Sequence, residues 1–214
     1  SPERWLATTL TYDPFGNVTS VTDALGRTTT NTYDATGTFL TKITNVLGHT
    51  RELAYDPQFG AVTRSVDPNG QVTTTQYDAL GRVSALIGPT DTAALPTLYH
   101  LYTVANPISR TTTCVKVQSG ADAYLCSHTF TDSLGRTRQV RSPAEDPAQQ
   151  VVSGNVEFDA RGQVVKQWVP YLAAGSGAYV PVSLEPSASS LASVAYTYDV
   201  LGRVVSDAVT TLGS

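Results

Sequence analysis

The chain repeats a tyrosine-aspartate pair, followed by a glycine, at a nearly constant interval. The members of this repeat are Tyr12, Asp13 and Gly16; Tyr33, Asp34 and Gly37; Tyr55, Asp56 and Gly60; Tyr77, Asp78 and Gly81; and, later in the chain, Tyr198, Asp199 and Gly202. A regular period of about 22 residues indicates a repeat architecture, in which function belongs to the assembled surface and not to a single catalytic loop.

A second set of turn sequences lies midway between the first, which makes the structural unit about eleven residues long. These turns run from Asp23 to Gly26, from Asn45 to Gly48 and from Asp67 to Gly70. Asp or Asn followed three residues later by Gly is typical of a type I turn, in which the side chain accepts a backbone hydrogen bond. The residues between turns are rich in threonine, valine and aromatics, which favour strands. The sequence therefore predicts a β-meander over residues 12–84.

The repeat tyrosines are expected to lie along one edge of this meander, because alternate turns lie at opposite edges of a sheet. Tyrosines on every second strand would then be about 10 Å apart. We expect them to form a packing seam that holds repeat to repeat. A platform on which a ligand stacks is the alternative.

An arginine follows several of the turns, at Arg27, Arg82, Arg136 and Arg203. These side chains are suited either to pairing with turn aspartates of neighbouring units or to forming a ligand-binding rim. Their regularity favours the structural role, in which each exposed pair contributes about 0 to 1 kcal/mol.

The whole chain is predicted to be all-β and to form one continuous repeat element over residues 1–214. Apolar residues do not keep a helical spacing, and Gly, Pro and Thr interrupt every window. Regular repeats occupy 12–84, and irregular hairpin insertions are expected at about 87–128 and 142–194. An open sheet with more than about ten strands curls or splits, so the antiparallel hairpins should form a curved open strip.

Two longer hairpins are expected within these insertions. Arg110–Gln118 should pair with Ala123–Thr131. Asn155–Val169 should pair with either Tyr179–Leu184 or Val194–Asp199. Insertions in repeat proteins usually extend hairpins at one edge in this way.

The composition makes several partners unsuitable. Charged residues are 15% of the chain and the net charge is −4, so no basic face is available for nucleic acid or for an anionic membrane. No apolar stretch approaches the length of a membrane span. The chain begins with Ser and contains no Met, which suggests a fragment of a larger protein. A strip cut from a longer sheet has unpaired edges, so self-association through an edge strand is expected.

The Tyr-Asp-x-x-Gly-Arg pattern resembles the YD repeats of the Rhs family. It is clearest over residues 12–84 and returns at Phe130–Arg136, Phe158–Gly162 and Tyr198–Arg203. The family includes bacterial polymorphic toxins, the B and C components of insecticidal toxin complexes, and the extracellular teneurins. The resemblance implies a long β-strip that spirals into a hollow shell, which in the toxins encloses a toxic C-terminal polypeptide.

The two cysteines, Cys114 and Cys126, are equidistant from Gly120. If a turn is centred there, they face each other across two strands at a distance that a disulfide can bridge. Three states of these cysteines are compatible with the sequence: a disulfide, two reduced thiols, or a zinc site that also uses His128 and His100. The spacing matches no common zinc pattern.

No catalytic, metal-binding or cofactor-binding constellation is evident, so we expect a protein that is not an enzyme. The histidines are scattered, and the aspartates begin turns. The first functional interpretation is a structural shell segment of a secreted toxin, with the rest of the parent polypeptide and its enclosed cargo as partners. The alternative is an extracellular adhesion or carbohydrate-binding module that contacts a cell-surface glycan or protein. Its candidate ligand contacts are Tyr99, Tyr102, Trp168 and Tyr171.

Overall fold

The computed structural model describes residues 6–175, 177–185 and 188–210, and the remaining parts of the predicted 1–214 element lie outside the described residues. The described chain contains strands and two short 3-10 turns, and no α-helix. The prediction of an all-β fold is therefore confirmed. No helix in these three ranges is long and apolar enough to cross a membrane.

The chain divides into two compact units. The first runs to Tyr99 and also contains Ser119–Ala121, and the second contains His100–Gln118 and continues from Asp122. Strand β9 (Leu98–Thr103) begins in the first unit and continues in the second.

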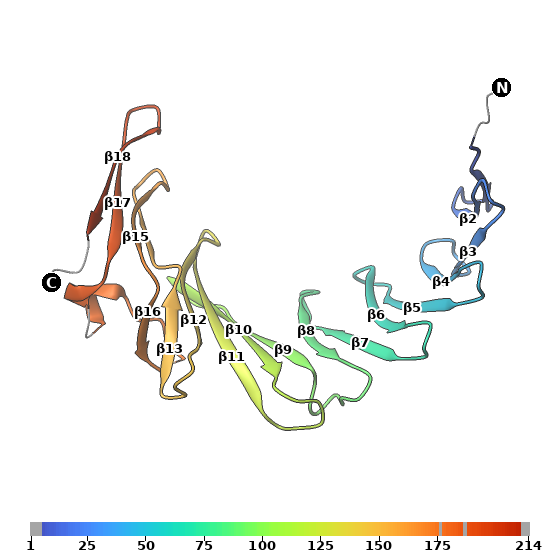
Figure 1. Ribbon diagram of the computed structural model, residues 1–214, viewed down its shortest axis with the longest axis horizontal. Coiled ribbons are helices and arrows are strands. Elements are labelled where there is room, and N and C mark those ends of the chain that lie inside the picture. The colour runs from blue at the N-terminus through green and yellow to red at the C-terminus, as the bar shows by residue number, and fades with distance from the viewer. Residues whose placement is uncertain (1–5, 176, 186–187, 211–214) are drawn as a thin grey trace. The chain divides into compact units, whose positions relative to one another are not determined.

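The first unit is an antiparallel meander in which each strand pairs with its neighbours in sequence (Figure 1). Its strands are β1 (Thr9–Tyr12), β2 (Val18–Thr22), β3 (Thr28–Tyr33), β4 (Leu40–Thr44), β5 (Thr50–Asp56), β6 (Ala61–Val66), β7 (Val72–Tyr77) and β8 (Val83–Ile87), followed by the first residues of β9. The predicted meander over 12–84 is confirmed.

A shift in strand register precedes each repeat tyrosine. It occurs between Thr32 and Tyr33 and between Gln76 and Tyr77, for example. The hairpins at the opposite edge, such as β2–β3 and β6–β7, pair without a shift. A bulge of this kind bends the strand and changes the direction of the side chain next to it. The two edges of the meander therefore differ in backbone geometry as well as in sequence.

The first unit is a single layer for most of its length. Strands β1 to β7 contain no buried residue among those described, and β8 contributes Ala85. Without a second layer, much of the stability must come from pairs across neighbouring strands. The hydroxyls of Thr22 and Thr28 lie 2.8 Å apart in one such pair.

The second unit contains two sheets, so the meander does not continue to the end of the chain. The first sheet has the order β9-β10-β11-β12-β13-β16, and the second has the order β14-β15-β17-β18. Their further strands are β10 (Ile108–Lys116), β11 (Tyr124–Asp132), β12 (Thr137–Pro143), β13 (Gln149–Ser153), β14 (Val156–Phe158), β15 (Val164–Trp168), β16 (Tyr171–Ala174), β17 (Ser193–Tyr198) and β18 (Val204–Thr210). The chain leaves the first sheet after β13 and returns with β16.

The β10–β11 hairpin has the register expected from the sequence, because Cys114 pairs with Cys126. Of the two alternatives for the later hairpin, the structure shows β15 pairing with β17, which includes the Val194–Asp199 segment. The alternative that used Tyr179–Leu184 as a strand is wrong. Pro181 begins a 3-10 turn there, η1 (Val182–Leu184), and proline cannot donate a hydrogen bond to a sheet.

Candidate functional site

Most repeat turns in both units share one geometry. In the Asp23 turn, Oδ1 of Asp23 accepts hydrogen bonds from the N–H groups of Leu25 and Arg27 at 2.9 and 3.0 Å. The N–H of Gly26 donates to the carbonyl of Asp23, and Gly26 has a φ of 77°. The same pattern recurs at the turns that begin with Asn45, Asp67, Asp78, Asp132 and Asp199. These aspartates are backbone acceptors and are poorly placed to act as acids or bases.

Hydrogen bonds to the turn carboxylates favour their ionised form. The backbone N–H of Arg27 and then its side chain lower the pKa of Asp23, and Arg203 lowers that of Asp199 in the same order. For Asp78, the side-chain hydrogen bond from Arg82 is the main cause of a lowered pKa. Ionised turn carboxylates are thus part of the folded structure.

The four turn arginines each bind the aspartate of their own turn. The Nε of Arg82 donates to Oδ2 of Asp78 at 2.7 Å, and Nη2 lies 2.6 Å from the same oxygen. Arg27, Arg136 and Arg203 bind Asp23, Asp132 and Asp199 in the same way. These four ion pairs therefore lie within one turn, whereas the sequence suggested pairs between neighbouring units. In a tight turn, an arginine four residues after the aspartate lies close to it. The ion pair within the turn therefore forms more easily than a pair between units.

The repeat tyrosines fasten each repeat to the preceding strand. The hydroxyl of Tyr77 donates to the carbonyl of Val62 at 2.8 Å, and Tyr55 does the same to Leu40 at 3.0 Å. Equivalent bonds join Tyr33 to Val18 and Tyr198 to Val164. The acceptor lies fifteen residues upstream in the three regular repeats. The repeat pattern predicts a seam but not this bond, for which the constant spacing is the only signal in the sequence.

Aromatic rings cover Gly37, Gly60 and Gly81 on the tyrosine edge. The ring of Phe15 lies over Gly37, where an added Cβ would be 2.5 Å from it, and Phe59 lies over Gly81 at 2.8 Å. Phe39 stacks on Tyr55 with ring centroids 4.8 Å apart. On the opposite edge, an added Cβ at Gly26, Gly48 or Gly70 would meet nothing within 4 Å. Side chains therefore connect successive turns along one edge of the first unit, as a structural seam would require.

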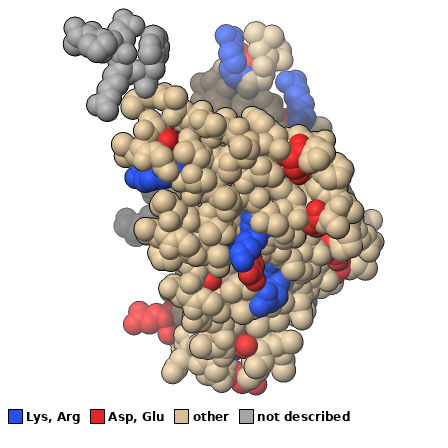
Figure 2. Space-filling view, turned by 90° about the vertical axis from the view of Figure 1, so that its right-hand side faces the viewer, with Lys and Arg blue, Asp and Glu red and all other residues tan. Residues whose placement is uncertain are grey.

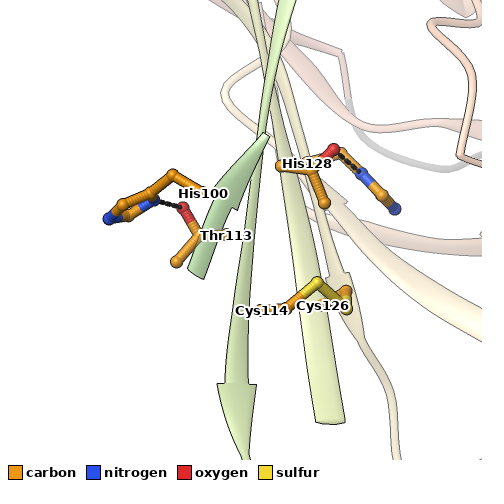
Figure 3. The surroundings of a disulfide bond; sticks show 6 residues. His100, Thr113, Cys114, Cys126 and His128 are labelled. Atoms are coloured by element: carbon orange, nitrogen blue, oxygen red, sulfur yellow. Dashed lines mark hydrogen bonds between the residues drawn. A yellow bond between two sulfur atoms is a disulfide. The ribbon is translucent and has the colours of Figure 1, made fainter. Parts of the chain in front are cut away.

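A disulfide joins Cys114 to Cys126 in the second unit, with the Cα atoms 4.0 Å apart (Figure 3). His100 and His128 lie on opposite sides of this hairpin. Each contacts a threonine of β10: His100 Nδ1 lies 2.9 Å from Thr113 Oγ1, and His128 Nδ1 lies 2.9 Å from Thr112 Oγ1. The set needed for the alternative zinc site is therefore not brought together.

A buried polar network lies between β12 and the segment that follows β16. Gln139 and Arg141 of β12 are 0% and 1% exposed, and Arg141 forms an ion pair with Glu185. Nε of Arg141 donates to Oε1 of Gln139 at 2.9 Å, and Nε2 of Gln139 donates to Oδ1 of Asn155 at 2.9 Å. Each buried charge thus has a partner, as burial requires. No sequence motif marks this network, because its members are far apart in the chain.

The four candidate ligand contacts are not brought together as one site. Tyr99 and Tyr102 are three residues apart on β9, so their side chains point to opposite faces of the strand. Trp168 is 8% exposed and lines a cavity of about 110 Å³. Tyr171 accepts a hydrogen bond from Asn155, and burial followed by the charge of Glu185 raises its pKa to about 12. These positions suit Trp168 and Tyr171 to packing, while ligand contact by Tyr99 or Tyr102 stays a prediction.

Metal-ligating side chains do not form clusters in the described part of the chain. No group of three or more His, Cys, Asp or Glu side chains could hold a metal ion there. On the face shown in Figure 2, Lys and Arg side chains are few and scattered. The most regular feature of the molecule remains the bonded edge of the repeats.

Comparison with known proteins identifies similar repeats and similar folds. The family model described as RHS Repeat matches residues 12–38 and 58–93. Among curated proteins, none matches the sequence significantly.

Solved structures of toxin components share the fold. TcdB2-TccC3 without its hypervariable C-terminal region superposes with a TM-score of 0.73 and 15% identity over 94% of this chain. TcdB2-TccC3 itself gives 0.72 and 18%, and a Tc holotoxin pore of Photorhabdus luminescens gives 0.71 and 14%, each over 94% of this chain. The chain spans 12 to 15% of the length of those chains.

Proposed function

We propose that this chain, which matches the RHS Repeat family model over residues 12–38 and 58–93, is a wall segment of a larger secreted toxin shell that encloses a toxic C-terminal polypeptide. The observation that carries the proposal is the fold shared over 94% of the chain with a short part of TcdB2-TccC3. A wall requires repeated strands that are bonded to one another, and it requires no catalytic groups. The tyrosine bonds and ring contacts of the repeat edge meet that need.

The partners follow from this role. They are the rest of the parent polypeptide, of which residues 1–214 would be one continuous repeat element, and the enclosed cargo. The place of action would be outside the producing cell. The low content of charged residues, 15%, suits a wall that must not bind nucleic acid or anionic membranes on its way.

Protease protection of the parent polypeptide tests the proposal. If this segment is part of a closed wall, the polypeptide enclosed by it stays uncleaved at protease concentrations that digest the same polypeptide expressed alone. Replacing Tyr55 and Tyr77 by Phe in the parent should weaken the wall and increase cleavage of the cargo. Tyr196→Phe, on β17 and outside the series of repeat tyrosines, is the matched control. Equal cleavage with and without the wall would contradict the proposal, and specific binding on a glycan array would favour the adhesion role.

A further inference from the structure

A nine-residue segment of the second unit, residues 177–185, lies against the strands β10, β11 and β12. We call this segment the strap. Its contacts are, in order along the segment, Arg110 Nη1 to the carbonyl of Gly177, the Phe130 ring to the Tyr179 ring at 5.7 Å, Gln139 Nε2 to the carbonyl of Val180 at 2.7 Å, and Arg141 to Glu185. The strap is therefore bound by four side chains from three successive strands, and two of the four are cations.

His128 lies at the centre of these contacts. It pairs with Thr112 of β10 on one side and with Arg141 of β12 on the other. Its Nε2 would be 3.6 Å from a Cβ placed on Gly177, and Nη1 of Arg110 would be equally close. The strap thus passes directly over the imidazole ring, and glycine leaves the room for this approach.

The charged groups around His128 and the strap are predominantly positive. Arg110 faces it from β10 and Arg141 from β12, while Glu185 of the strap supplies a carboxylate to Arg141. The hydroxyl of Tyr171, from β16, is close to Glu185 and stays protonated. A proton on His128 would therefore add a third positive charge to a partly buried region with one carboxylate.

We propose that the strap is an acid-responsive cover and that His128 is the group that senses acid. The inference rests on the strap contacts and does not depend on the proposed shell function. Opening the strap exposes the partly buried imidazole further to water, which solvates its positive form better and screens the two arginines. The open state therefore binds a proton more tightly than the closed state. By linkage, protonation shifts the strap toward the open state.

The pH dependence of strap opening follows from the difference in the pKa of His128 between the closed and the open state. Burial, followed by the charges of Arg110 and Arg141, lowers the pKa of His128 in the closed state. In the open state the pKa returns toward about 6.5. The closed strap thus has its full stability above about pH 6.5 and loses it as the pH falls through the lower, closed-state pKa.

Hydrogen exchange of the strap amides tests this proposal. Protection factors are measured between pH 7.5 and 5, corrected for intrinsic exchange, on the full chain with its disulfide intact. We expect protection of the strap to fall toward acid by up to about tenfold per pH unit, the limit for uptake of one proton. Fluorescence of Trp168 in a Trp5→Phe background gives a second readout, because Trp168 lines a cavity together with Pro181, Val182 and Ser183.

Two histidine variants separate the sensor from a general effect of acid. His128→Gln should abolish the pH response of the strap while leaving its protection at pH 7.5 in place. His100→Gln is the matched control, because His100 makes a similar contact with Thr113 on the other side of the hairpin (Figure 3). It should leave the response unchanged.

A Glu185→Gln variant tests the contribution of the ion pair with Arg141 to strap closure. It removes the carboxylate that pairs with Arg141, so the strap should lose protection already at pH 7.5. The proposal is overturned if the wild-type strap keeps the same protection from pH 7.5 to 5. It is equally overturned if His128→Gln responds to acid like the wild type, or if His100→Gln removes the response.

Discussion

At the residue scale, the tyrosine hydroxyl distinguishes a repeat tyrosine from any large apolar residue. Each bond in the regular repeats reaches a main-chain carbonyl near the start of the preceding strand, so the tyrosine stabilises the preceding hairpin and not its own turn. A phenylalanine would keep the ring packing and lose this tie.

We predict that Tyr77→Phe lowers the unfolding free energy of the first unit by about 1 kcal/mol, because the carbonyl of Val62 loses its donor. Urea unfolding followed by far-UV circular dichroism measures the change. Tyr12→Phe is the control: Tyr12 is 59% exposed on β1, the first described strand of its sheet, and the substitution should have almost no effect. Equal losses for the two variants would refute the role of the hydroxyl.

The repeat glycines offer a comparison between the two edges. Gly81 and Gly70 have nearly equal φ values of 75° and 78°, but an added Cβ at Gly81 would be 2.8 Å from Phe59 and one at Gly70 would be free. Both alanine variants should lose about 1 to 2 kcal/mol through the left-handed backbone. Gly81→Ala should lose about 1 to 3 kcal/mol more through crowding. The extra loss should shrink in a Phe59→Leu background, and an unchanged difference there would exclude the ring as its cause.

At the element scale, the hairpin β10–β11 is constrained by a bond that the first unit lacks. The disulfide closes a loop between positions that are 12 residues apart. In the unfolded chain, such a closure removes conformational freedom and so favours the folded state.

We predict that replacing both cysteines by serine lowers the unfolding free energy of the second unit by about 3 kcal/mol. Urea unfolding monitored by Trp168, in a Trp5→Phe background, measures this loss. When the wild-type chain is unfolded and then reduced, its intact mass should increase by the mass of two hydrogen atoms. The first unit serves as the internal control, since its described strands contain no cysteine. A native chain with two free thiols would contradict the prediction.

At the scale of the whole molecule, the turn carboxylates link stability to pH in both units. The pKa values of Asp23, Asp34, Asp78 and Asp199 are lowered in the folded state, where hydrogen bonds favour the charged form. Their contribution is present above about pH 4, the ordinary Asp range, and is lost as the pH falls through the lower folded values.

We therefore predict cooperative loss of β structure below about pH 4, measured by far-UV circular dichroism against pH. This pH range lies well below the range in which the strap should open. Strap opening and acid unfolding can therefore be separated in one pH titration. Replacing Asp78 by Asn, which keeps an acceptor at the turn but cannot be ionised, should reduce the acid dependence of the first unit. A stability that does not change between pH 5 and 2 would contradict this account.

The sequence by itself determined the all-β class, the meander over residues 12–84 and the position of each turn, because these depend on local chemistry. Turn aspartates and glycines act within four residues, and strand composition repeats with the same period. The facing of Cys114 and Cys126 also followed from the symmetry of one hairpin. Local interactions of this kind are written into neighbouring positions and need no knowledge of the rest of the fold.

Only the tertiary structure decided how the second unit is arranged. The chain leaves the first sheet of this unit after β13 and returns to it with β16. Arg141 is buried with Glu185, which is 44 positions away in the sequence. Such contacts have no period, and a buried ion pair depends on which surfaces exclude water. The same holds for the bond from Tyr198 to Val164, which crosses an insertion of no fixed length. The repeat pattern identified its tyrosine, and only the fold identified the acceptor.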